Sequence, residues 1–128
     1  MAFSATIKEA IDIGGELIEL VNTFSAGALQ KLSESIPDAS TDLLVAFNLD
    51  ITQAKVIYLA ADQDVTVKTN SSSVPDDTKN LLAGIPLVWH ASSDHANPFN
   101  ADITALYVTN ASGAAAALRF YDLHDPTV

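Results

Sequence analysis

Cysteine is missing from the sequence, and its absence excludes disulfide bonds, thiol catalysis and zinc sites with cysteine ligands. Basic residues are scarce as well, because six lysines and arginines stand against sixteen acidic residues, for a formal net charge of −10. The bases are scattered singly along the chain. Binding a nucleic acid needs several cations that converge on one groove. We therefore expect no nucleic-acid partner.

Long apolar runs are absent too. No stretch approaches the roughly 20 residues that span a bilayer, and the opening MAFSATIKEA lacks the basic region and the apolar core of a signal peptide. We expect no membrane contact and synthesis in the cytoplasm. A chain of 128 residues suits one domain that buries about two-thirds of its unfolded surface. The sequence therefore predicts a single domain over residues 1–128.

Alternation of side chains with period two dominates the second half of the chain. It predicts strands over residues 41–49, 54–60, 64–69, 85–90 and 102–110. The last two are apolar on both faces, which indicates central strands. The residues that we predict to be mostly buried are Val45, Phe47, Val56, Tyr58, Val65, Val67, Ile103, Ala105, Tyr107 and Leu118.

Glycine, proline and asparagine punctuate the chain every ten or so residues, which is typical of a β-sandwich or barrel. Gly14 and Gly15 suit a two-residue hairpin loop. We therefore favour strands in the first thirty residues, with short amphipathic helices as the alternative. Residues 114–117 are all alanine, which favours helix, but their neighbours favour a closing hairpin. The predicted fold is an all-β antiparallel sandwich, jelly-roll or immunoglobulin-like, with a loose tail over residues 122–128.

The sequence contains one weak cluster of possible metal ligands. His90, Asp94 and His95 lie within six residues and could reach one divalent metal if their loop folds back. The spacing matches no specific motif, and we favour a solvated loop that holds two histidines. Trp89 could be a stacking platform for a sugar or a partner, although a single tryptophan flanked by Leu87 and Val88 is more often in the core or half-buried under a loop. We predict no catalytic residue, no cofactor and no metal, and hence no enzyme.

Three segments carry a family resemblance: DQDVTVKTNSSSVPDDT, then LLAGIPLVWH, then DITALYVTNASGAAAALRF. Over residues 33–120 the chain resembles a group of small virion proteins of tailed bacteriophages, which share a similar succession of strand, TNS loop, PLVW run and YVTNASG turn. The resemblance implies a β-sandwich structural component of the head. It carries no catalytic residues to this chain.

The leading hypothesis is therefore a virion protein that decorates and cements the capsid, with copies of itself and the major capsid protein or other virion proteins as partners. A head-to-tail connector or tail component, and a sugar- or peptide-binding module, are the alternatives. Residues 1–28 match the family less well and carry apolar side chains free for a partner. The predicted contact residues are Phe3, Ile7, Ile11, Trp89 and Phe99.

Overall fold

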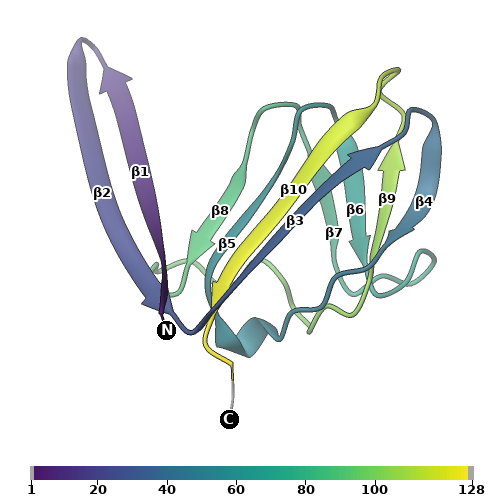
Figure 1. The fold of residues 1–128 in the computed structure, drawn as a ribbon. Helices are drawn as coiled ribbons and strands as arrows, with labels where there is room; N and C mark the ends of the chain where they lie inside the picture. The colour runs from purple at the N-terminus through teal and green to yellow at the C-terminus, as the bar shows by residue number, and fades with distance from the viewer. Residues whose placement is uncertain (1, 127–128) are drawn as a thin grey trace.

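The computed structural model describes residues 2–126, and these fold into two four-stranded antiparallel sheets and a separate two-stranded hairpin (Figure 1). A single 3-10 turn, η1 (Ile51–Gln53), is the one helical element of the described residues. The strands are β1 (Phe3–Ile13), β2 (Glu16–Ala26), β3 (Ala28–Ile36), β4 (Ser40–Val45), β5 (Ala54–Ala61), β6 (Val65–Thr69), β7 (Thr78–Leu81), β8 (Leu87–His90), β9 (Leu106–Asn110) and β10 (Ala116–His124). The predicted strands in the first thirty residues are confirmed.

The two sheets have the strand orders β3-β10-β5-β8 and β4-β9-β6-β7. Strand pairs therefore nest, since β3 pairs with β10, β4 with β9, β5 with β8 and β6 with β7. This is the order obtained when one long antiparallel ribbon wraps into two facing sheets, the eight-stranded jelly roll. The predicted all-β sandwich is confirmed, and of its two variants the connectivity is that of the jelly roll. We call β3 to β10 with their loops the body, and β1 with β2 the arm.

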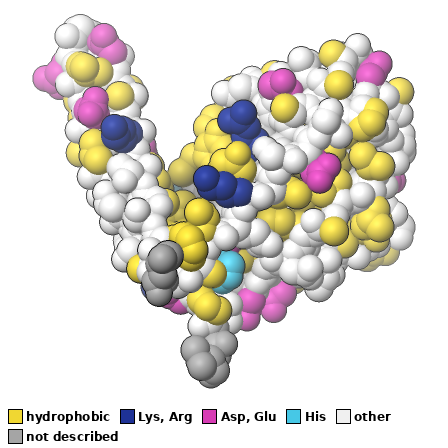
Figure 2. Space-filling model, in the orientation of Figure 1, with side chains coloured by type: hydrophobic (Ala, Val, Ile, Leu, Met, Phe, Trp, Pro, Cys, Tyr) yellow, Lys and Arg dark blue, Asp and Glu magenta, His cyan; other side chains and the backbone are white. Residues whose placement is uncertain are grey.

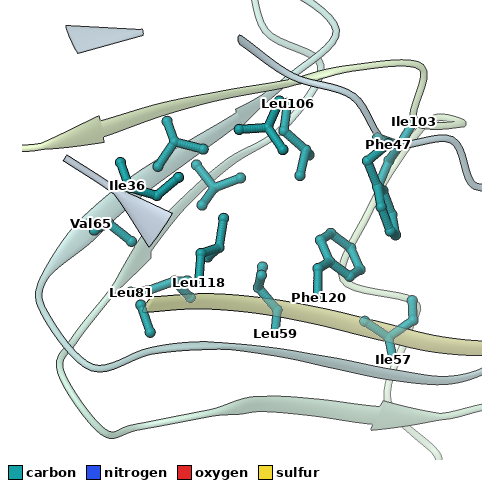
Figure 3. Packing of buried hydrophobic residues seen from close by; sticks show 14 of the residues in the cluster. Ile36, Phe47, Ile57, Leu59, Val65, Leu81, Ile103, Leu106, Leu118 and Phe120 are labelled. Carbon is teal, nitrogen blue, oxygen red and sulfur yellow. The ribbon is translucent and has the colours of Figure 1, made fainter. Parts of the chain in front are cut away.

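Aromatic and branched side chains from both sheets meet in one core (Figure 3). Phe120 lies at its centre, with the Phe47 ring stacked at 4.2 Å and the Phe99 ring at 5.6 Å between centroids. Leu106 and Leu118 reach this core from opposite sheets and are fully buried. The body therefore builds its core from its own two sheets, although Leu44, Leu82 and Ile85 on its surface stay exposed.

Two strands turn the opposite face inward from the one predicted. In β5 the inward residues are Ile57 and Leu59, while Tyr58 is half-buried on the outside. In β9 they are Leu106 and Val108, so Tyr107 points outward; the preceding Ala105 is only partly buried. Both strands are apolar on both faces, and alternation sets the period of a strand but not which face is buried. The other predicted core residues, Val45, Phe47, Val56, Val65, Val67, Ile103 and Leu118, are buried.

The predicted positions of two late elements are also corrected. Strand β8 lies at a sheet edge and not at the centre. Strands β9 and β10 do not form a closing hairpin, because each pairs within a different sheet. The Asn110 side chain fixes this crossing by donating to the carbonyl oxygens of Ile36 and Ala114, at 3.0 and 2.8 Å. Hydrogen bonds from an asparagine side chain to the backbone stabilise a turn of this kind, and strand or helix propensities do not reveal them.

The C-terminal segment is not a loose tail from residue 122. Strand β10 continues to His124, and Leu123 is buried. Asp125 then accepts a hydrogen bond from the Gly27 N–H at 2.9 Å and donates its own N–H to the Gln53 carbonyl. Residues 127 and 128 lie outside the described residues. The segment up to Asp125 is thereby attached to the junction between the arm and the body.

Candidate binding surface

The arm is a regular hairpin of two 11-residue strands. Its register runs unbroken from the Phe3 to Ala26 pair to the Ile13 to Glu16 pair. The turn between them requires positive φ, and Gly14 and Gly15 supply it with φ of 60° and 88°. The predicted glycine turn is therefore confirmed.

Because paired residues point to the same side of a ribbon, the arm has two distinct faces. The inner face continues from the residues that touch the body, and it is mostly apolar towards the tip. It comprises Ala5, Ile7, Glu9, Ile11, Ile13, Glu16, Ile18, Leu20, Asn22 and Phe24. The outer face is mixed, with Ser4, Thr6, Lys8, Ala10, Asp12, Leu17, Glu19, Val21, Thr23 and Ser25.

Only the base of the arm packs on the body. Ile7 and Phe24 lie against a small buried cluster that includes Val56 and Leu123. The Phe24 ring also lies 4.8 Å from the ring of His90. This contact covers the lower part of the outer surface of the β3-β10-β5-β8 sheet and sets the direction in which the arm leaves the body (Figure 1).

The half of the arm nearest the turn at Gly14 and Gly15, which we call the outer half, is left uncovered by the rest of residues 2–126. Ile11, Ile18 and Leu20 of the inner face are 52%, 42% and 59% exposed. Leu17 and Val21 of the outer face are exposed as well. A two-stranded hairpin alone is marginally stable at best in water, and exposed apolar patches mark interaction sites. The outer half of the arm is therefore the strongest candidate for a binding surface.

The backbone edges of the arm point to the same conclusion. Strands β1 and β2 each pair only with one another, so the outward N–H and C=O groups of both strands are free of strand partners. Proteins usually protect such edges with proline, bulges or rows of lysine. The arm has no proline, an unbroken register and a single lysine, Lys8. These edges are open to another chain.

Facing the arm is the outer surface of the β3-β10-β5-β8 sheet, and the two enclose a deep notch (Figure 2). At the bottom lies a cavity of about 330 Å³ between the arm base and this sheet. Above the contact with the arm, strand register places two rows of side chains on the wall of the notch. The rows are Lys31, Tyr121, Tyr58 and Val88, and then Ser33, Arg119 and Ala60.

The wall of the notch is aromatic and basic. The rings of Tyr58 and Tyr121 lie 6.0 Å apart, and the Lys31 Nζ lies 5.8 Å from the centre of the Tyr121 ring. Neither Lys31 nor Arg119 has an ion pair within residues 2–126. The two rows contain no acidic residue. Two of the six bases of a chain with charge −10 therefore face the notch without a counter-charge.

The predicted contact residues divide into two groups. Phe3 and Ile11 are exposed on the arm and Ile7 is half-buried at its base. The prediction that Phe99 contacts a partner is wrong, because this side chain is 2% exposed and stacks on Phe120. Trp89 is half-buried against the core and donates its indole N–H to the His95 carbonyl at 2.8 Å. Its polar atom is thus held by the loop that follows β8.

The residues considered for a metal do not form a site. Asp94 and His95 are exposed on the loop after β8, whereas the His90 ring packs against Phe24. Within residues 2–126 no group of three histidine, aspartate or glutamate side chains is placed to hold a metal ion. His90, Asp94 and His95 are close in the sequence, but the fold does not bring their side chains together around one point.

One buried carboxylate, Asp122, contacts a histidine, which is a pair that acid–base catalysts also use. Asp122 is 1% exposed, accepts a hydrogen bond from the Gln30 Nε2 at 2.7 Å and contacts the His124 Nδ1. Gln30 also donates to the Asn48 carbonyl. Both carboxylate oxygens are engaged, so this group holds β10 against β3 and the chain near Asn48.

The sequence does not predict that the wall of the notch is a candidate binding surface. The alternation of side chains predicts Tyr58 in the core, and it predicts no role for Lys31, Arg119 or Tyr121. The available signal was the apolar character of both faces of residues 54–60, which indicates that the outer face of that strand is covered by something. The arm covers only part of it.

Comparison with known proteins adds no relative. No protein-family model matches the chain, and neither a curated protein nor a solved structure matches it at a significant level. None of the helical segments in residues 2–126 is long and apolar enough to cross a membrane.

Proposed function

We propose that the protein is a non-enzymatic structural component of a tailed-bacteriophage virion, where it decorates and cements the capsid. The observation that carries the proposal is the arm, which projects from the body and leaves its apolar outer half uncovered. Such an element is stabilised when a partner covers it. It suits a protein that works by assembly.

Two further observations support the proposal. The sequence of residues 33–120 resembles small tailed-phage virion proteins, and the body has the jelly-roll connectivity that viral capsid and lectin domains use. Fold alone does not set function, so the resemblance supplies the biological setting and the arm supplies the mode of action. The partners are copies of the protein itself and the major capsid or other virion proteins.

The test is to count copies of the polypeptide in purified particles on a quantitative gel. A decoration protein is present in hundreds of copies, and its loss leaves the tail attached. A low-copy ring at the neck or tail would favour the connector or tail component instead. Absence from purified virions would end the virion proposal.

A binding experiment tests the role of the arm in the same setting. Recombinant protein is added to particles that lack it, and occupancy is measured for the wild type, for the double variant Ile11→Asp and Ile18→Asp, and for Val74→Asp. Val74 is 80% exposed in the loop between β6 and β7 and controls for an added surface charge. We expect the control to bind like the wild type and the arm variant to lose most occupancy. Equal occupancy of all three would remove the arm from the mechanism.

A further inference from the structure

We infer that the partner of the arm is a second copy of this chain, joined in a reciprocal clasp in which each arm enters the notch of the other copy. The inference deepens the assembly function proposed above and rests on it. It names the occupant of the notch, which is the arm of the other copy. A two-fold arrangement of this kind uses the same two surfaces on both copies and closes on itself.

The order of layers in the clasp follows from topology. Each notch lies between an arm and its own sheet, so two interlocked copies stack as sheet, partner arm, arm and partner sheet. The inner faces of the two arms then pack on one another, and each outer face packs on the partner's sheet. Layers of this type stack about 10 Å apart.

The inner faces are suited to each other. Ile11, Ile18 and Leu20 form a continuous apolar stripe on the outer half of the inner face. Glu9 and Glu16 lie at its two ends on the same face. Packing two such stripes removes from water apolar surface that the single copy leaves exposed, with the acids at the rim.

The outer face and the sheet wall are complementary in charge. The arm carries four acids, Glu9, Asp12, Glu16 and Glu19, against the single base Lys8. Asp12 and Glu19 lie on the outer face, which the clasp places on the wall with Lys31 and Arg119. Figure 2 shows acidic side chains towards the far end of the arm and basic side chains on the body beside the notch. Complementary potentials of this kind select a partner and its orientation.

Closure of the arm on its own sheet is the competing arrangement. Ile7 and Phe24 wedge the base of the arm against Val56, Leu123 and His90 and so hold the two walls of the notch apart. Closing would also place the inner face on the sheet and leave Asp12 and Glu19 in solvent, away from Lys31 and Arg119. A second copy uses both faces of the arm.

Light scattering on the purified protein tests self-association without any particle. We expect a concentration-dependent dimer, a rise of roughly tenfold or more in its dissociation constant for Ile18→Asp, and no change for Val74→Asp. Circular dichroism must show the body folded in both variants. A wild type that stays monomeric up to high micromolar concentration, or an Ile18→Asp dimer as tight as that of the wild type, would overturn the clasp.

A charge exchange distinguishes the clasp from self-closure. One variant carries Asp12→Lys and Glu19→Lys, which makes its arm basic; the other carries Lys31→Glu and Arg119→Glu, which makes its sheet wall acidic. Each alone places like charges together in a clasp, so both are expected to dimerise weakly. Their mixture restores both attractive contacts and is expected to give a heterodimer by native mass spectrometry. If mixing restores nothing, the clasp is wrong, whereas the virion proposal is judged separately by the copy count.

Discussion

The arm and the body solve the same physical problem in opposite ways. The strands of the body bury their inward side chains between two sheets, with Phe120, Leu106 and Leu118 fully enclosed. The arm has two of the longest strands of the protein, yet of its own residues only Ala26 is fully buried. Strand length and regular hydrogen bonding are therefore not what makes the body stable.

The difference between the two regions lies in the number of layers. A ribbon of two strands has no second sheet on which to pack, so the alternation of its side chains produces one apolar face that remains in water. The base of the arm packs on the body, and the apolar side chains of its outer half stay exposed. Substitutions in the two regions should therefore differ in kind, and not only in size.

The largest effect is expected in the body. Phe47→Ala removes a ring that is 3% exposed and stacked on Phe120, and it should lower the free energy of unfolding by about 3 to 5 kcal/mol. The loss combines transfer energy with the cavity that remains. Urea denaturation followed by fluorescence of Trp89 measures it. An unchanged midpoint would show that the core is less dependent on this stack than its geometry indicates.

A smaller and local effect is expected at the junction. Phe24→Ala removes the half-buried ring that packs on the base cluster and on His90. We expect the arm to lose about 1 to 2 kcal/mol of local stability, since the ring is only partly buried. Amide exchange in β1 and β2 should accelerate while that of β9 and β10 stays as in the wild type. Faster exchange throughout both sheets would mean that the arm and the body unfold as one unit.

Sequence predicts the class of this fold well because its signals are local. Alternation at Val65 and Val67 and the glycine pair at 14 and 15 depend on period and turn chemistry alone, and both predictions are confirmed. The inward faces of β5 and β9 were wrong because both faces of each strand are apolar. In such strands burial depends on long-range packing, which no local pattern contains.

The candidate surface could be predicted only in part, for the same reason. The apolar residues of the first 28 positions marked that segment for a partner, and Ile11 is indeed exposed on the arm. Phe99 looked similar in sequence, but the fold carries its loop into the core beside Phe120. Lys31 and Arg119 lie 88 positions apart and become neighbours on one wall only through the pairing of β3 with β10.

A matched pair of glycine substitutions separates strain in the two regions. Gly15 and Gly113 both have positive φ, 88° and 95°, and neither has an atom within 4 Å of an added Cβ. Alanine at either site therefore adds backbone strain of about 1 to 2 kcal/mol without a clash. We expect Gly113→Ala to lower the melting temperature of the body by roughly 4 to 8 °C. Gly15→Ala should speed amide exchange near the tip of the arm and leave that temperature unchanged.

The outcome that contradicts this pair is an equal fall in melting temperature for both variants. Such a result would mean that strain at the tip of the arm is transmitted to the sandwich, so that the arm belongs to the cooperative unit. The contact between the base of the arm and the body would then couple the two regions more strongly than its few buried residues indicate.

The smallest effect concerns an exposed carboxylate at the start of η1. The Thr52 hydroxyl and N–H both donate to the Asp50 Oδ1, at 2.6 and 3.0 Å, and these hydrogen bonds lower the pKa of Asp50 below its ordinary value. A folded pKa below the unfolded one means that the group stabilises the fold above the unfolded pKa and that this contribution is lost as pH falls through the folded pKa. We expect a slightly higher melting temperature for the wild type than for Asp50→Asn at neutral pH, with the difference shrinking below about pH 4.

The matched variant in the arm is Asp12→Asn, where the Asp12 Oδ1 accepts from the Gly15 N–H at 3.2 Å. That change should alter amide exchange at the hairpin turn without moving the melting temperature at any pH, and a shift as large as that of Asp50→Asn would show that the two regions are not thermodynamically separate.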